Sequence, residues 1–175
     1  GVATRWVLPP VAAMYAWLYF GSQLDSYQHH YLVSLILVCA CFVPWQRPRD
    51  AEPGTRVATW ALRLILVEIA IMYLWAAISK MNHAWIDGSA LSTQIVGPMR
   101  SLVDSTVGIA FASKLVIVVE LVLAATIWQP RFWWLAAPLG IAFHFGILFS
   151  GREIGLFAWL MISLYLFVVP DRLWV

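Results

Sequence analysis

Charged residues are scarce in this 175-residue sequence. Asp, Glu, Lys and Arg make up 11% of it, 62% is hydrophobic and the mean hydropathy is +0.80, whereas a soluble domain carries roughly 25% charged residues. This shortage excludes an ordinary soluble domain and predicts an integral membrane protein in contact with membrane lipids. The basic residues are dispersed and the net charge is only +2, so we expect no nucleic-acid partner.

Motifs for metals and nucleotides are also absent from the sequence. The two cysteines, Cys39 and Cys41, lie two positions apart in an apolar run, where a helix points them to different faces, so we interpret them as packing residues. There is no His-Glu-x-x-His, no Cys-x-x-Cys and no phosphate-binding glycine loop. We therefore expect no metal cofactor and no nucleotide.

Apolar segments dominate what is present. Six of them approach the ~20 residues that cross a bilayer, at residues 6–23, 30–45, 57–79, 113–128, 132–149 and 154–169. Their apolar residues run continuously instead of alternating, which disfavours strands and predicts an all-α bundle of about six transmembrane helices. Pro9 and Pro10 suit the first turn of the first helix.

The segment 84–106, between the third and fourth predicted spans, is too polar to cross the membrane. We predict an interfacial helix or a shallow re-entrant segment there, with an ordinary long loop as the alternative. With six spans both termini lie on one side of the membrane. That side collects more basic residues than the other, which places both termini in the cytoplasm; they are Arg5, Arg47, Arg49, Arg56, Arg131 and Arg172.

One lysine, Lys80, follows the third apolar span directly, at the point where the chain becomes polar. Trp75 and Trp85 flank it, and such rings favour the membrane–water interface. Two interpretations stay open. The ammonium extends to water as an anchor, or a partly dry pocket keeps the amine neutral and makes it a usable base.

Other ionisable groups accompany this lysine. The predicted connectivity brings His29, His144 and Arg152 to the same side of the membrane as Lys80. Glu68 and Glu120 fall inside the third and fourth spans, where a carboxylate needs a partner or a proton. We interpret both glutamates as structural polar groups, with a proton relay as the alternative.

Several ordered stretches resemble one known family. They are Tyr-Gln-His-His-Tyr-Leu-Val-Ser at 27–34, the stretch 73–88 around Lys80, Glu120, Phe143-His144, and Ile-Gly-Leu-Phe at 154–157. Together they are similar to the membrane domain of the vitamin K-dependent γ-carboxylases and of the bacterial HTTM (horizontally transferred transmembrane) proteins. The resemblance implies a single membrane domain over 1–175 in the bacterial inner membrane. It also implies that the family's first helices and lumenal domain lie outside this chain, which is then a fragment of a longer domain.

The resemblance also implies a chemistry. In that family a neutral lysine, matched by Lys80, deprotonates reduced vitamin K; oxygen then yields a strong base and an epoxide, and the base leads to carboxylation of a glutamate. His29 and His144 match the supporting histidines of the family. We expect Tyr73, Trp85 and Arg152 to contact the substrate, a quinone or a hydroquinone like reduced vitamin K.

Three hypotheses follow from these observations. The first is a membrane enzyme with quinol-linked epoxidase or carboxylase chemistry and Lys80 as its base. The second is a non-catalytic subunit that packs against other proteins of a membrane complex, and the third is a lipid- or quinone-binding protein. The surroundings of Lys80 discriminate between them, because an enzyme needs this amine beside a histidine and a substrate site, whereas a packing subunit leaves it in water or in an ion pair.

Overall fold

The computed structural model of the chain describes residues 2–21, 28–43, 60–150 and 157–169, and their side chains except those of Val2, Gln28 and His29. Every element in these ranges is a helix, which confirms the predicted all-α class for the described residues. The chain divides into two compact units, Gly1–Glu68 and Ile69–Val175.

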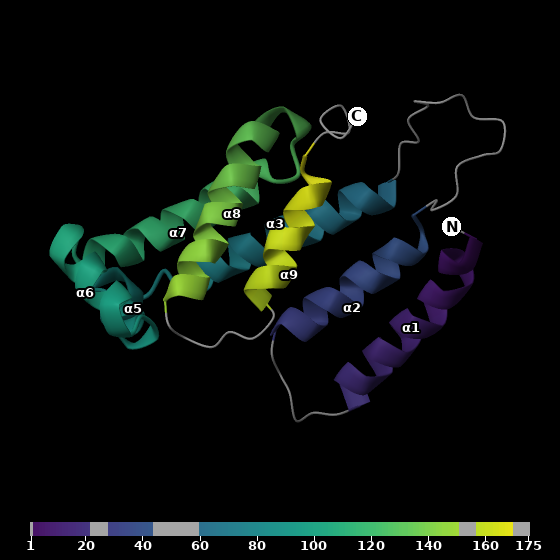
Figure 1. The fold of residues 1–175 in the computed structure, drawn as a ribbon, viewed down its shortest axis with the longest axis horizontal. Coiled ribbons are helices and arrows are strands. Elements are labelled where there is room, and N and C mark those ends of the chain that lie inside the picture. Colours follow the sequence, from purple (N-terminus) through teal and green to yellow (C-terminus); the bar gives the residue numbers. More distant parts are fainter. Residues whose placement is uncertain (1, 22–27, 44–59, 151–156, 170–175) are drawn as a thin grey trace. The chain divides into compact units, whose positions relative to one another are not determined.

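The first unit contains a pair of helices that pack side by side, α1 (Val2–Gly21) and α2 (Gln28–Cys41), as Figure 1 shows. Pro9 and Pro10 lie inside α1. The expectation that they occupy its first turn is therefore wrong, since the helix begins about two turns earlier. A proline has no backbone N–H to donate to the helix, and its ring distorts the turn before it.

Helix α3 (Trp60–Ser79) contributes to both units, because the boundary between them falls after Glu68. In the first unit the ring of Trp60 lies 5.5 Å from the ring of Phe42. The helix ends at Ser79, where the amides of Lys80 and Met81 bond to carbonyls three residues back, at 3.1 and 3.0 Å. Such tightened turns satisfy carbonyls that a helix end leaves open.

The second unit continues from α3 through helices of very different length. The long ones are α7 (Ile109–Thr126) and α8 (Trp133–Phe149), joined by the short 3-10 turn η1 (Pro130–Phe132). After the gap at 151–156 the chain forms α9 (Phe157–Leu164) and the 3-10 turn η2 (Tyr165–Phe167). α8 packs against both α7 and α9.

Within the described residues, three helical stretches are long and apolar enough to cross a membrane: Trp60–Ser79, Ile109–Thr126 and Pro130–Phe149. They correspond to the third, fourth and fifth predicted spans. The second and sixth predicted spans contain the shorter apolar helices His30–Cys41 and Phe157–Phe167. The first overlaps α1, which is not one of the three. The total of six spans therefore stays a prediction.

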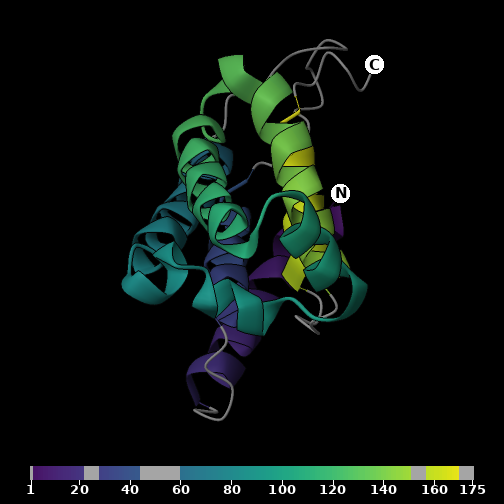
Figure 2. The same cartoon turned by 90° about the vertical axis from the view of Figure 1, so that its left-hand side faces the viewer.

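The polar segment between the third and fourth predicted spans folds into three short helices, which lie along the beginning of α7 (Figure 2). They are α4 (His83–Ile86), α5 (Ser89–Gln94) and α6 (Gly97–Thr106). Gly88 connects the first two with a φ of +86°, and a Cβ there would lie 2.8 Å from the backbone of Ala110. Only glycine combines that backbone conformation with so close an approach. The amide of Val96 bonds to the carbonyl of Ser150 at 3.0 Å, so this segment is also fastened to the end of α8.

Small residues let the helices of the second unit approach one another. Ala136, Ala137 and Gly140 form the buried stripe of α8, and small residues on a stripe are what close packing of membrane helices requires. A Cβ at Gly140 would lie within the ring of Tyr165. The absence of a side chain at this position therefore makes room for the tyrosine.

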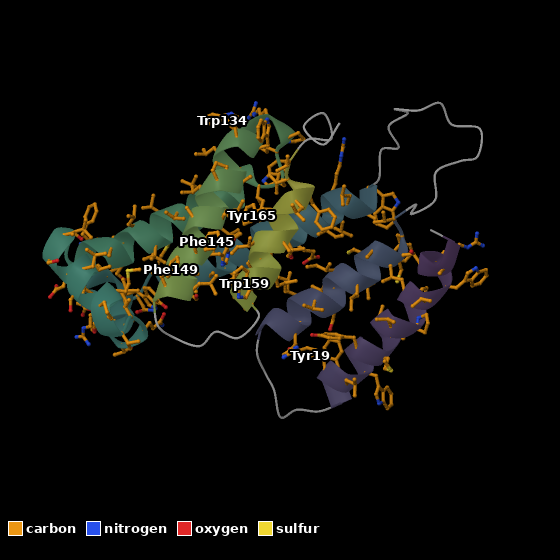
Figure 3. The ribbon with its side chains drawn as sticks, in the orientation of Figure 1. Tyr19, Trp134, Phe145, Phe149, Trp159 and Tyr165 are labelled. Carbon is orange, nitrogen blue, oxygen red and sulfur yellow. The ribbon has the colours of Figure 1, made fainter. Side chains whose placement is uncertain are left out.

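Aromatic side chains cover part of the outer face of α8 and α9 (Figure 3). The ring of Phe145 lies 6.4 Å from that of Phe149 and 6.2 Å from that of Trp159, and all three side chains are exposed. An exposed apolar face of this kind suits contact with lipid, because lipid tails are as apolar as the side chains of a protein interior.

Candidate functional site

Lys80 and Glu120 form an ion pair between the end of α3 and the middle of α7. The Nζ of Lys80 lies 2.8 Å from Oε1 and 3.0 Å from Oε2 of Glu120, and it also donates to the carbonyl of Ala76 at 3.3 Å. The side chains are 19% and 6% exposed. The ammonium, which has three N–H donors, is thus bound to two acceptor groups, a carboxylate and a carbonyl.

The pair joins residues 40 positions apart in the chain, one after the end of α3 and one well inside α7. Glu120 is the twelfth residue of α7, about 17 Å from its beginning at 1.5 Å per residue. The end of α3 therefore meets α7 near its middle, and the short helices α4, α5 and α6 flank the first turns of α7 instead.

Trp85 of α4 covers the amine of Lys80. Its half-buried ring lies 5.3 Å from Nζ, within range of a cation–π contact. The carbonyl of Trp85 accepts a 2.5 Å hydrogen bond from the hydroxyl of Ser113, which is fully buried on α7. Asn82 begins α4 by accepting from the amide of Trp85 at 3.2 Å. Two hydrogen bonds thus hold the backbone of Trp85, which carries the ring above the amine.

A second polar cluster lies in the interior of the same unit. The hydroxyl of Tyr73, on α3, is 2.6 Å from Nε2 of His144, on α8, and 2.8 Å from the hydroxyl of Tyr165, on η2. The three residues are 2%, 1% and 1% exposed. Nδ1 of His144 has no hydrogen-bond partner among the described residues. A neutral hydrogen-bonded cluster of this kind joins three helical elements in an apolar interior.

The first unit contains a comparable pair. The hydroxyl of Tyr15, on α1, lies 2.7 Å from Nδ1 of His30, on α2. The ring of Tyr19 lies 6.2 Å from the same imidazole. Of the two adjacent histidines, the structure thus describes the side chain of His30, whereas the side chain of the predicted His29 lies outside the described residues.

The structure brings the predicted site residues together in two groups, Lys80 with Glu120 and Trp85, and Tyr73 with His144. Arg152 lies outside the described residues. Glu68 is half-buried on α3, and among the described residues it has no hydrogen bond or ion pair.

Sequence reasoning missed two partners in these groups, Tyr165 and Ser113. A signal for Tyr165 was present, since a tyrosine inside an apolar run needs a partner for its hydroxyl. The serine gave no such signal, because its bond to Trp85 depends on where α4 folds back.

Metal-binding groups do not gather in the part of the chain that the structure describes. No three His, Cys, Asp or Glu side chains there lie close enough to hold a metal ion. What the described groups offer is acid–base and hydrogen-bonding chemistry, from one amine, one carboxyl, one imidazole and two phenols.

Comparison with known proteins identifies one family. The model described as the HTTM domain matches residues 1–174, nearly the whole chain. No match was found among curated proteins or among solved structures.

Proposed function

This chain belongs to the HTTM domain family of membrane proteins, and from that membership we propose that it carries out quinol-linked chemistry of the vitamin K-dependent carboxylase type. Lys80 is the base in this proposal. The substrate is a hydroquinone similar to reduced vitamin K. The reaction requires molecular oxygen as a co-reactant, and it leads to epoxidation with or without carboxylation.

The observation that supports the proposal best is the ion pair of Lys80 with Glu120. Both groups are largely withdrawn from water, and two contacts of 2.8 and 3.0 Å join them. A lysine that acts as a base in a membrane needs a neutral amine. It need not become neutral without a partner, because a neighbouring carboxylate can take its proton. In a dry site, a proton can pass from the ammonium to the carboxylate, which exchanges two charges for two neutral groups.

Glu120 thus acts as a proton store for Lys80. Once the carboxyl holds the proton, the free lone pair of Nζ accepts the hydroxyl proton of the substrate. The ammonium that results lies beside the new substrate anion and compensates its charge. The bond broken is the substrate O–H, the bond formed is Nζ–H, and the carboxyl of Glu120 stays neutral until the substrate leaves.

A hydroquinone bound near this pair would supply the acidic hydroxyl and the electrons that reduce oxygen. The ring of Trp85, 5.3 Å from Nζ, offers a stacking surface for an aromatic substrate. Tyr73 and His144, both of the second unit, complete the proposed site as supporting residues. For His29 and Arg152, whose side chains lie outside the described residues, a supporting role rests on the family resemblance alone. We place the site on the outer side of a bacterial inner membrane, with both termini in the cytoplasm.

A second candidate is a non-catalytic subunit of a membrane complex. One observation favours it: the amine of Lys80 is already bound to the carboxylate of Glu120 and the carbonyl of Ala76, as a purely structural pair requires. In this case the pair locks α3 to α7, and the exposed aromatic face of α8 and α9 contacts lipid or another protein. A carrier of quinone or lipid, without turnover, is a variant of this candidate.

The test compares oxygen-dependent oxidation of a hydroquinone by membranes that carry the wild-type chain, Lys80→Ala, Glu120→Gln and Lys114→Ala. Lys114 is the matched control, since it is an exposed lysine on α7. Loss of a positioned base lowers the rate by about a hundredfold or more. We expect that loss for Lys80→Ala only, a smaller loss for Glu120→Gln with a changed pH profile, and wild-type rates for Lys114→Ala.

Two outcomes contradict the proposal. Equal rates for Lys80→Ala and Lys114→Ala would remove Lys80 from the chemistry. No turnover in the wild type, together with purification of the chain in a defined complex, would establish the subunit instead.

A further inference from the structure

In the buried cluster of Tyr73, His144 and Tyr165, the number of available hydrogens decides which group donates in each hydrogen bond. Each phenol has one hydrogen to donate, and a neutral imidazole has one. Burial at 1% exposure, among hydroxyls and aromatic rings, keeps the imidazole of His144 neutral. Three donors are therefore available for two observed bonds, those of Tyr73 to His144 and to Tyr165.

Three arrangements of these hydrogens are possible. In one of them Nε2–H and the hydroxyl of Tyr165 both donate to the oxygen of Tyr73, which leaves the hydroxyl hydrogen of Tyr73 and the lone pair of Nδ1 unused. The other two differ in the direction in which Tyr73 donates. In what we call the first arrangement, Tyr165 donates to Tyr73 and Tyr73 donates to Nε2 of His144, which leaves one unused donor, the Nδ1–H. In the second, Nε2–H donates to Tyr73 and Tyr73 donates to Tyr165. The hydroxyl hydrogen of Tyr165 and the lone pair of Nδ1 are then both unused. Because each unused polar group in an apolar interior is costly, the first arrangement prevails.

The first arrangement leaves Nδ1 of His144 as a buried donor with no partner among the described residues. Buried donors are almost always satisfied. From this geometry we propose that His144 is a ligand-binding residue whose Nδ1–H donates to the carbonyl oxygen of an apolar molecule held inside the second unit. Tyr73 and Tyr165 are positioning residues that fix the tautomer.

A neutral carbonyl is the acceptor that fits these surroundings. The imidazole contacts the rings of Phe143 and Phe157, at 5.3 and 5.9 Å between centroids. A charged carboxylate or phosphate would be costly among such rings, whereas a carbonyl on an aromatic or aliphatic body is not. A quinone has such an oxygen, and so does the ester of a membrane lipid. The quinone source depends on the proposed function; the lipid source does not.

The test observes the carbonyl itself. A quinone or a lipid ester labelled with ¹³C at the carbonyl is added to the full chain in bilayers, and infrared difference spectra record the stretching frequency of the label. A hydrogen bond from Nδ1 lowers that frequency. This measurement uses the wild-type chain first, so it does not depend on how any variant folds.

Two substitutions then separate the two nitrogens of the ring. His144→Gln keeps an acceptor within reach of Tyr73 but has no donor in the place of Nδ1. His144→Asn keeps a donor near that place and loses the acceptor for Tyr73. His83→Gln is the control, because the side chain of His83 is fully exposed. Thermal unfolding of each variant checks that the fold is kept.

We expect the lowered frequency in the wild type, in His83→Gln and, in part, in His144→Asn, but not in His144→Gln. Loss of one net hydrogen bond should also weaken binding of the labelled ligand by about tenfold in His144→Gln. A lowered frequency for the lipid ester alone supports the site while it contradicts the quinone proposal. An unchanged frequency for both labels, or one equal in the wild type and in His144→Gln, overturns the inference and leaves His144 as a structural residue.

Discussion

The ion pair of Lys80 and Glu120 should behave as a coupled unit in a double-mutant cycle. Lys80→Met leaves a carboxyl that is 6% exposed without its counter-charge. A free glutamate titrates near pH 4.3, so holding this carboxyl protonated at pH 7 costs up to about 3.7 kcal/mol. Glu120→Met leaves the ammonium unpaired. The loss of one partner from a buried pair costs about 3–5 kcal/mol, and we expect about 3 because Lys80 remains 19% exposed.

The double variant, Lys80→Met with Glu120→Met, removes both charges and fills the space with apolar side chains. Such replacements are often neutral or stabilising. We therefore expect the double variant to be more stable than either single variant. Since the two single costs sum to at most about 6.7 kcal/mol, the coupling energy should then exceed about 3.7 kcal/mol. The cost of Lys80→Met should also fall by about 1.4 kcal/mol for each pH unit from 7 toward 5, as protonation of the free carboxyl becomes less costly.

The assay is chemical unfolding in detergent micelles, followed by helical circular dichroism at several pH values. Independent sites add to within about 0.5 kcal/mol. Additive costs for the two single variants would therefore show that Lys80 and Glu120 do not interact in the folded protein. They would refute both the pair and the proton store that the proposed function requires.

Two further predictions concern single positions. In Gly140→Ala the second unit should unfold at a lower temperature than in wild type, since the added methyl overlaps the ring of Tyr165. The matched Gly146→Ala, with nothing near its Cβ, should keep the wild-type melting temperature, and equal melting temperatures for the two variants would contradict this packing. The pKa of Asp87 is lowered, first by the hydrogen bond from the backbone of Ser89. A lowered pKa means that the carboxylate stabilises this turn above about pH 4 and loses that effect as the pH falls through the folded value. Protection of the Ser89 amide from hydrogen exchange should therefore fall in acid in wild type but not in Asp87→Asn, and a parallel fall in both would contradict the assignment.

The long apolar runs could be interpreted from the sequence because a membrane helix is a local structure. Continuous hydrophobic residues near residues 57–79, 113–128 and 132–149 predicted helices that the structure places at Trp60–Ser79, Ile109–Thr126 and Pro130–Phe149. The predicted helix start at Pro9 and Pro10 was wrong, since a proline suits the first turn of a helix but does not exclude an interior position. Whether the shorter apolar helices also cross the membrane depends on neighbours and lipid, which local hydropathy does not report.

The sequence by itself determined the membrane class, the HTTM family and the place of Lys80 at the end of an apolar helix. Only the tertiary structure decided that Lys80 meets Glu120, and that Tyr73 meets both His144 and Tyr165. These partners lie 40 to 92 positions apart in the chain. Helical periodicity fixes which face of a helix a residue occupies, but the stagger and rotation of one helix against another fix what that face touches. Packing around small residues such as Gly140 sets that arrangement, and with it the chemistry available to the buried groups.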